Sequence, residues 1–578
     1  MKCVLLLFLT FSLSAQNRWE VSPQKAYEKF LVGAKIDNLQ LSNNTKIIDN
    51  KHKLILILAF DSDCPMSRKL APEVKRIEEE FMSKSVRFIH LSVSSFDQRR
   101  KVLSAYKSRG FQGELVFDDN KKVQSYFKMR TTCEVILIDS SGTVIFRGAI
   151  NDQYGIGFTR ETAKNHYLKD ALTTSLKQQI PKVRLTSVPG CILESENLPL
   201  NLKSEVTFHN QISRIMQNRC QSCHRKDGVG PFELVSYNQV KGRSKMIKYV
   251  IEKKIMPPWF AEGGGPWQND CSLSSKEERD ILSWVKNKCP EGDEKDAPIP
   301  LKWDSKWQLD TPDLIINIPQ NIKVPAEGKV PYINVFVQIP LKKDRWVSSM
   351  EIRSEQSRVL HHVLIMDDPT GSKKLNKRVF RGGTQGFFGA LVPGQSLTEY
   401  PEGTGKALRA GSWLKFQLHY TPNGKAVEDK ISLAVKFLDS PPEKMIRTVS
   451  ASNARFSIPP NHPNFKIEAQ YRFPVNATVL AFSPHTHLRG KSFKYELEYP
   501  DGRKKTVLDV PNYDFNWQLR YILQTPLKVP RGSKMICTAI YDNSSDNPAN
   551  PDPNARVRYG DQTEDEMMIG YFEGYIGY

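Results

Sequence analysis

The sequence lacks any long uninterrupted apolar segment. Nowhere in its 578 residues do about 18 apolar residues follow one another, which is the length that a helix needs to cross a bilayer. It also has no long Lys/Arg tract and no interleaving of basic and aromatic residues, although its net charge is +20. Basic residues spread along a chain are typical of a solvated surface. We therefore expect a protein that does not span a membrane and does not bind nucleic acid.

Cysteine is scarce, with nine residues in the whole chain. This number is too small for a fold held together by disulfides, so each cysteine needs its own explanation. Cys3 opens an apolar run that follows Met1-Lys2 and precedes the small residue Ala15. The pattern predicts a signal peptide over residues 1–15 and therefore an exported protein, periplasmic or secreted. The sequence leaves the pairing of four other cysteines open: Cys191, Cys271, Cys289 and Cys537.

The chain is long enough for several domains, and the first of them, residues 30–190, alternates between strand and helix patterns. Residues 54–60 form a continuous apolar run, as expected of a parallel strand that is buried on both faces. Further strands are expected at 86–93, 114–117, 134–138 and 143–146, and helices at 67–84, 97–110 and 166–178. We therefore predict an α/β domain.

Residues 204–292 have helical periodicity, and an acidic, proline-rich linker follows at 290–300. Helices are expected at 211–218, 240–253 and 275–288, the last one beginning with a capping box at residues 274–277. Cys271 and Cys289 flank this last helix. It would be roughly 18–20 Å long, whereas a disulfide spans at most about 7 Å between Cα atoms. We therefore predict that these two cysteines do not pair.

Cys220-x-x-Cys223-His224 has the spacing at which a c-type haem is attached. The two thiols form thioethers with the haem vinyl groups, and the adjacent imidazole then falls beneath the iron. A zinc site or a disulfide is the alternative. Met256, in a proline-rich loop after an amphipathic helix, is the expected second axial ligand, and His209 is a weaker candidate. The segment resembles a small cytochrome c domain, which implies an electron carrier of relatively high potential.

From residue 301 onward the helical pattern fades. Short alternating runs recur at 332–339, 359–366 and 413–420, and Pro, Gly and Asn turns separate them. This pattern predicts β-sandwich structure. The length suffices for two sandwiches, which we place at 301–450 and 451–578, with the Pro-Pro-Asn segment 459–461 as a candidate seam.

Five histidines and one methionine in this half form the most informative pattern of the chain: His361, His362, His419, His485, His487 and Met567. Residues i and i+2 of a strand face the same side, so His485 and His487 can bind one ion without distortion. His361 and His362 face opposite sides of a regular strand and can share a metal only where the strand bends. A lone histidine is more often a core residue, but the joint pattern indicates metal sites. Imidazole suits several metals, whereas the added thioether points to copper, because Met stabilises Cu(I).

Four stretches in order carry a resemblance to the copper type II, ascorbate-dependent monooxygenases, the family of dopamine β-monooxygenase and peptidylglycine α-hydroxylating monooxygenase. They are residues 359–363, 417–420, 485–490 and 565–567, the last shortly before Tyr571. The resemblance implies two β-sandwich domains with one copper each. It implies an electron-storing copper and an O2-binding copper, held respectively by His361, His362 and His419 and by His485, His487 and Met567. It also implies catalytic roles at the second copper set and at Tyr571 and Gln417.

The sequence departs from this family at three positions. The peptide-amidating members have an Arg two residues before the His-x-His motif, where this chain has Ser483. Their Asn two residues after the Met ligand is Ile569 here. A glycine-extended peptide is therefore not the expected substrate. Cys537 resembles one half of a family disulfide, but Met568 occupies the place of its partner, so Cys537 is expected to be free.

Residues 30–190 resemble the thioredoxin-like redoxin and peroxiredoxin group. Cys64 lies between the first core strand and the next helix, where that family keeps its redox cysteine and where a helix N-terminus lowers the thiol pKa. Ser67 replaces the second cysteine of a C-x-x-C motif, and Asp61 stands where peroxiredoxins have Thr. Cys133 aligns with the segment that packs against the family's active-site cysteine, which implies a Cys64–Cys133 disulfide or dithiol pair. A retired redox scaffold that serves for docking is the alternative.

These patterns predict an exported redox protein with a thioredoxin-like α/β domain, a small all-α cytochrome c domain and two all-β jelly-roll-like sandwiches. It would bind two copper ions and one covalently attached haem c, and hydroxylate a C–H bond of a small organic molecule with O2 and two electrons. Family members take these electrons from ascorbate. Here the fused haem, or a redox partner protein, is expected to supply them to the three-histidine copper. Two alternatives stay open: a non-catalytic electron-transfer or copper-handling protein, and a thiol-redox protein acting through Cys64.

Overall fold

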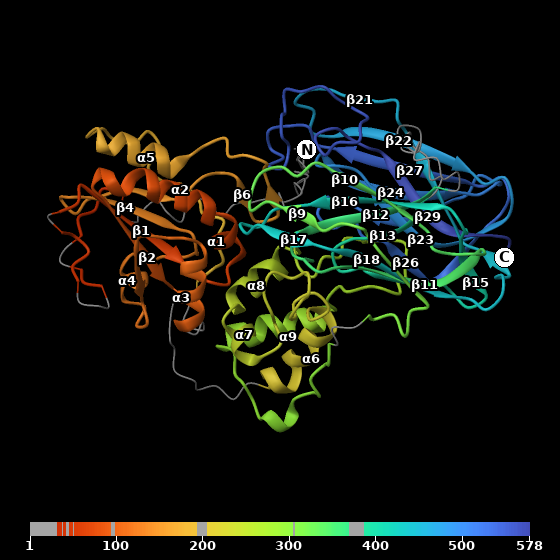
Figure 1. Cartoon of the computed structure of the whole chain (residues 1–578), viewed down its shortest axis with the longest axis horizontal. Helices are drawn as coiled ribbons and strands as arrows, with labels where there is room; N and C mark the ends of the chain where they lie inside the picture. The colour runs from red at the N-terminus through yellow and green to blue at the C-terminus, as the bar shows by residue number, and fades with distance from the viewer. Residues whose placement is uncertain are drawn as a thin grey trace, which may run out of the picture.

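The computed structural model describes residues 32–36, 39–41, 45–49, 51–93, 99–193, 205–303, 307–368 and 387–578. The predicted signal peptide lies outside the described residues. Figure 1 shows an α/β unit from the first third of the chain, a group of helices from the middle, and a large unit of β-strands from the C-terminal half. The protein is therefore multidomain and mostly β, with a thioredoxin-like region near its start. Among the residues that the structure describes, no helix combines the length and the apolar character that crossing a membrane requires.

The α/β unit is built on a five-stranded sheet with the strand order β3-β2-β1-β4-β5. Its strands are β1 (Leu54–Phe60), β2 (Val86–Ser92), β3 (Glu114–Phe117), β4 (Val135–Asp139) and β5 (Val144–Gly148). The first three run parallel, and β4 pairs antiparallel with β1 and with β5. All seven residues of β1 are buried, which confirms the strand expected from its continuous apolar run.

The helices of this unit are shorter than their pattern predicts. The single helix expected over 67–84 is wrong, because the structure has α1 (Pro65–Lys69) and α2 (Ala71–Phe81) with Leu70 between them. Pro72 explains the break, since proline lacks the N–H of a helix interior and fits only the first turn of a new helix. The other helices of the unit are α3 (Arg99–Ser108), α4 (Lys122–Tyr126) and α5 (Tyr167–Leu176).

The helical unit packs around the buried indole of Trp284. Its helices are α6 (Ser213–Arg219), α7 (Tyr237–Lys241), α8 (Ser244–Glu252) and α9 (Ser275–Lys286), with a short π-turn before α6 at Phe208–Ile212. The helix expected over 240–253 is broken at Gly242 and Arg243, so its first turn belongs to α7. The capping box of Ser274 and Glu277 is confirmed at the start of α9.

The β unit contains four larger sheets that pack in pairs. In the first pair, the sheet β10-β16-β12-β13 shares a core with the sheet β19-β15-β11-β18-β8. These strands are β8 (Leu314–Asn317), β10 (Ile333–Gln338), β11 (Arg345–Ser354), β12 (Leu360–Asp368), β13 (Phe387–Leu391), β15 (Thr404–Leu408), β16 (Trp413–Tyr420), β18 (Ile431–Phe437) and β19 (Lys444–Met445). We call this pair of sheets the first sandwich.

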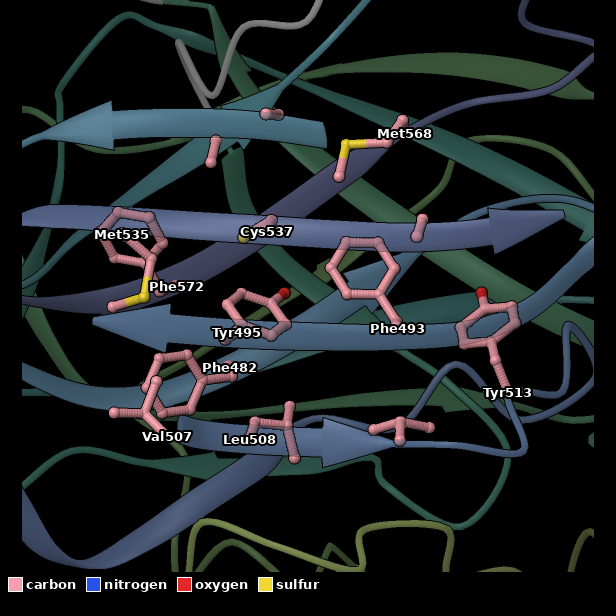
Figure 2. Packing of buried hydrophobic residues seen from close by; sticks show 14 of the residues in the cluster. Phe482, Phe493, Tyr495, Val507, Leu508, Tyr513, Met535, Cys537, Met568 and Phe572 are labelled. Atoms are coloured by element: carbon pink, nitrogen blue, oxygen red, sulfur yellow. The ribbon is translucent and has the colours of Figure 1, made fainter. Parts of the chain in front are cut away.

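The second sandwich pairs the sheet β20-β29-β23-β26 with the sheet β22-β27-β24-β25. These strands are β20 (Arg447–Ser452), β22 (Phe465–Arg472), β23 (Ala477–His485), β24 (Gly490–Glu498), β25 (Lys504–Val510), β26 (Tyr521–Val529), β27 (Lys534–Tyr541) and β29 (Ile569–Ile576). Figure 2 shows the core between them, in which Phe482 and Phe572 of one sheet meet Tyr495 of the other. The chain enters this sandwich at β20, so residues 459–461 form a loop within it rather than a seam before it.

The helical unit is anchored on the second sandwich by its loop between α8 and α9. Phe260 of this loop joins the sandwich core, and Trp267 forms a bridge with Leu523. The Asn269 side chain donates to the carbonyl of Arg520 at 2.7 Å and accepts from the N–H of Ile522 at 3.0 Å. Backbone and side-chain hydrogen bonds together therefore fix where the helices stand on the sandwich.

Candidate metal centres

A β-bulge solves the problem posed by the adjacent histidines. Strand β12 pairs with β16 so that Leu360 lies opposite Tyr420, but His362 lies opposite His419, and the register shifts between these two pairs. The extra residue in the bulge is His361. A bulge re-aims the side chain of the inserted residue, which lets both neighbours face the same metal site.

The three-histidine set, His361, His362 and His419, is compact. Its ligand atoms all lie within 4.8 Å of one another, and the two Nδ1 atoms of His361 and His362 are 3.0 Å apart. The buried Nε2 of His361 and Nδ1 of His419 have no hydrogen-bond partner. Buried nitrogens without partners are costly, and a metal ion would satisfy them. The set therefore fits a metal held by three imidazoles.

Burial keeps these imidazoles neutral. It lowers the pKa of His361 to about 4 and that of His419 to about 2, with repulsion between the neighbouring rings adding to the second value. The pKa of His362 is also well below its usual value, for the same two reasons. A neutral imidazole is the form that binds metal, so the set is ready to bind at neutral pH.

The second set consists of His485, His487 and Met567. His485 ends β23 and His487 follows two residues later, which leaves their ring centroids 5.3 Å apart. The Nδ1 of His485 donates to Oε1 of Gln518 at 2.6 Å, and the Nδ1 of His487 donates to the carbonyl of Asp565 at 3.1 Å. Both bonds leave the Nε2 atoms free for a metal, which is how outer residues orient histidine ligands. Burial lowers the pKa values of the two rings to about 4 and about 3.

Glu566 ties the methionine to the His-x-His segment. Its carboxylate accepts from the backbone N–H of His487 at 2.8 Å and from that of Arg489 at 2.6 Å. Burial raises the pKa of Glu566 to about 7, although these hydrogen bonds act against the increase. The neighbouring Met567 is buried with 4% of its surface exposed. The fold therefore holds the thioether on the same side of the sandwich as the two imidazoles.

Both sets line one cavity of about 1920 Å³. Its wall includes the three other positions that the sequence singled out at this site, Gln417, Tyr571 and Ser483. Ile569, by contrast, is buried in β29 opposite His485. Sequence reasoning missed Gln518 and Phe515. Gln518 carried no signal because it lies 33 residues from the histidine it orients, and Phe515 belongs to no motif.

The C-x-x-C-H segment lies beside the same cavity, whose wall includes Ser222 and residues 225–229. The Nδ1 of His224 donates to the carbonyl of Phe232 at 3.0 Å, which leaves its Nε2 free. Burial raises the pKa of Cys220 to about 12.

The first sandwich also touches this segment. A Cβ atom added to Gly394 would stand 3.3 Å from the Sγ of Cys223. Met256 is half-buried in the loop after α8, and its pairing with His224 stays a prediction. His209 lies in the π-turn before α6, with its Nε2 3.7 Å from Glu291.

The predicted thiol neighbours meet in the α/β unit. Strands β1 and β4 pair, and the N–H of Cys133 donates to the carbonyl of Ala59, which brings the segment before β4 against the segment after β1. Cys64 and Cys133 are both buried, and the Sγ of Cys64 lies 2.9 Å from the hydroxyl of Thr132. Sequence reasoning missed a third thiol, since the Sγ of Cys191 lies 3.3 Å from that of Cys64.

The eight cysteines that the structure describes are all free thiols. Cys271 and Cys289 lie on either side of α9 and are not bonded, as predicted. Cys537 is fully buried in the core of the second sandwich, where Figure 2 shows it between Tyr495 and Met568. The expectation that Cys537 is free is therefore confirmed.

Comparison with known proteins finds one family match. Residues 445–576 match the copper type II ascorbate-dependent monooxygenase family, C-terminal domain. This segment contains the second sandwich with His485, His487 and Met567. No curated protein matches the chain. At the level of this domain, the match supports a copper-dependent monooxygenase, and the family implies dependence on copper and ascorbate.

Solved structures similar to parts of the chain include an uncharacterized conserved protein from Geobacillus kaustophilus, with 16% identity and a TM-score of 0.26 over 30% of this chain and 96% of that one. A putative thiol:disulfide interchange protein, DsbE from Chlorobium tepidum, has 13% identity and a TM-score of 0.19 over 20% of this chain and 84% of its own. StoA from Bacillus subtilis has 19% identity and a TM-score of 0.17 over 20% of this chain and 87% of its own.

Proposed function

We propose that the protein is an exported copper monooxygenase that hydroxylates a C–H bond of a small organic substrate with O2 and two electrons. The observation that carries the proposal is the presence of two sets of neutral, buried ligands on one cavity, with the second set inside the segment that matches the family. Copper held by the two sets would supply one-electron redox chemistry and O2 activation, with the Met567 thioether favouring Cu(I).

The protein residues prepare the site for this chemistry. Gln518 and the Asp565 carbonyl fix the tautomer and the orientation of the His485 and His487 rings. The cavity between the two sets offers the amide of Gln417 and the hydroxyl groups of Ser483 and Tyr571 to a bound substrate. Side chains of this kind orient a small polar molecule in an otherwise apolar cavity.

We further propose that a covalently attached haem supplies the electrons. Cys220 and Cys223 would form the thioethers, His224 would bind the iron through Nε2, and Met256 would be the second axial ligand. The bond from His224 to Phe232 supports this role, because it leaves Nε2 free. The contact between Gly394 and Cys223 also supports it, because it places the attachment segment against the first sandwich. An ascorbate-like reductant or a redox partner protein would reduce the haem in turn.

Copper and haem contents of the purified protein test the proposal together with O2 uptake. We expect two coppers, one covalent haem and reductant-dependent O2 uptake. Met567→Leu should abolish O2 uptake while haem reduction stays normal, since leucine keeps the volume but has no thioether. Met568→Leu is the matched control, because this adjacent methionine is in the sandwich core. Copper and haem bound without O2 uptake would instead indicate an electron-transfer or copper-handling protein.

A further inference from the structure

Three thiols from three separate parts of the chain form what we call the thiol cluster: Cys64, Cys133 and Cys191. Cys64 is central. Its Sγ lies 3.3 Å from that of Cys191 and 2.9 Å from the hydroxyl of Thr132, and it also hydrogen-bonds with Cys133. The cluster has no part in the proposed copper chemistry.

A backbone bridge holds Cys191 in place. The N–H of Thr132 donates to the carbonyl of Cys191 at 2.9 Å, and the N–H of Cys191 donates to the hydroxyl of Thr132 at 2.8 Å. Thr131 and Ile192 form the neighbouring bridge. A Cβ atom on Gly190 would stand 1.7 Å from the carbonyl oxygen of Thr132, so only glycine allows the two segments to approach this closely. The Thr132 hydroxyl, which accepts from Cys191, is left to donate to Cys64.

Cys64 is the thiol prepared to lose its proton. Burial by itself raises the pKa of Cys64, but hydrogen bonds from Cys133, Cys191 and Thr132 outweigh burial and hold that pKa well below its usual value. The hydrogen bond to Cys64, together with burial, raises the pKa of Cys191 well above its usual value. The Cys191 S–H therefore donates to the Cys64 thiolate. The guanidinium groups of Arg68 and Arg109 add electrostatic attraction for this thiolate.

The geometry favours a pair of thiols over a metal site. Within the described part of the chain, the three-histidine set alone has three or more His, Cys, Asp or Glu ligand atoms that all lie within 4.8 Å of one another. The thiol cluster does not meet this condition. A disulfide needs its sulfurs about 2.05 Å apart, and the 3.3 Å between Cys64 and Cys191 can be closed by a small side-chain movement.

Exposure distinguishes the two candidate partners of Cys64. Cys64 and Cys133 are each 2% exposed, whereas Cys191 is half-buried. Cys133 is also hydrogen-bonded to Ser67 at 3.3 Å. An external reactant can therefore reach the cluster only through Cys191.

We propose that Cys64 and Cys191 form a redox-active dithiol that exchanges two electrons with a low-molecular-weight disulfide. The proton of Cys191 passes to the Cys64 thiolate, and the Cys191 thiolate attacks the external disulfide, forming a mixed disulfide and releasing one thiolate. That thiolate takes the proton from Cys64. The Cys64 thiolate then attacks the Cys191 sulfur, forming the Cys64–Cys191 disulfide and releasing the second thiolate. The external disulfide is reduced by two electrons and the dithiol is oxidised by two.

Incubation of the full-length protein with glutathione redox buffers, followed by alkylation and peptide mass mapping, tests the proposal. We expect a Cys64–Cys191 cross-linked peptide to appear in one two-electron transition. Cys64→Ser should instead trap glutathione on Cys191, because the attacking thiolate of the second step is gone. Cys133→Ser should keep the Cys64–Cys191 cross-link. Thermal unfolding of each variant verifies that it is folded.

Thr132→Val gives a second, independent readout. It removes the hydroxyl that joins Cys191 to Cys64 but keeps the side-chain shape, and loss of a hydrogen bond to a charged group should slow the formation of the cross-link about tenfold. Three results would overturn the proposal: a Cys64–Cys133 cross-link in its place, cysteines that stay reduced at every buffer ratio, or a metal ion bound by the three thiols.

Discussion

The ring of Phe515 stacks on the imidazole of His361, with 5.1 Å between their centroids and 24° between their planes. The same ring meets His487 edge-on at 6.0 Å. One phenylalanine of the second sandwich therefore contacts a histidine of each metal set. Phe515 is the side chain through which the two sets constrain each other.

Phe515→Ala should destabilise the protein and loosen both sets. Phe515 is 8% exposed, and truncation of a buried phenylalanine costs about 3 kcal/mol of unfolding free energy. Phe515→Leu keeps most of the apolar volume but loses the ring, and should cost about 1 kcal/mol. Urea unfolding of the metal-free protein measures both values. Equal stability of the two variants would mean that ring stacking contributes nothing.

The two metal sets should lose copper independently. His419→Ala removes one ligand of the three-histidine set, and His487→Ala removes one of the second set. We expect each variant to bind one copper where the parent binds two, by elemental analysis of the purified protein. His462→Ala is the control, because this histidine of the second sandwich is exposed. Loss of both coppers in a folded single variant would contradict separate sites.

Gln518 should control copper affinity at the second set. Its Oε1 accepts from Nδ1 of His485 at 2.6 Å. Gln518→Leu removes this acceptor and should weaken copper binding about 10–100-fold, as is usual for outer residues that orient a histidine ligand. Gln518→Glu keeps an acceptor and should bind copper nearly normally. Competition titration with a Cu(I) chelator gives both affinities, and equal weakening in the two variants would exclude an orienting role.

Crowding at Gly394 should interfere with haem attachment. Gly394→Ala would place a methyl group 3.3 Å from the Sγ of Cys223, at a backbone φ of +84°. Gly411→Ala is a matched control, since its φ is +72° but its added Cβ meets nothing within 4 Å. We expect Gly394→Ala to lower covalent haem, measured by the absorbance of the pyridine complex, and Gly411→Ala to leave it unchanged. Equal haem in both would show that Cys223 has room to spare.

A buried ion cluster between the sandwiches should make stability depend on pH. Burial by itself raises the pKa of Glu573, but Arg520 at 2.6 Å and Lys406 at 3.3 Å outweigh it and lower this pKa to about 2. Because the folded pKa lies below the unfolded value of about 4.3, the carboxylate stabilises the fold above pH 4.3 or so, and this contribution is lost as pH falls towards 2.

Glu573→Gln should therefore cost about 3 kcal/mol at pH 7, since it leaves two buried cations without their partner. The difference in unfolding free energy between parent and variant should shrink as the pH is lowered from 5 to 3. Urea unfolding across this pH range measures it. A difference that does not change with pH would mean that Glu573 is not held as a carboxylate by these cations.

Residue chemistry alone determined much of this protein. The soft thioether of Met567 and the i, i+2 spacing of His485 and His487 indicated a copper site, because ligand type and strand period are local properties. The apolar run of β1 predicted a buried strand for the same reason. The break at Pro72 was missed, although proline's local geometry accounts for it.

Only the tertiary structure decided how distant residues meet. The bulge that turns His361 towards His362 depends on the register between β12 and β16, which no local pattern specifies. Gln518 and Phe515 reach the metal sets, and Cys191 reaches Cys64 across 127 positions of sequence, through loops that carry no periodicity. Side-chain type therefore specified which chemistry is available, and long-range packing specified which side chains share a site.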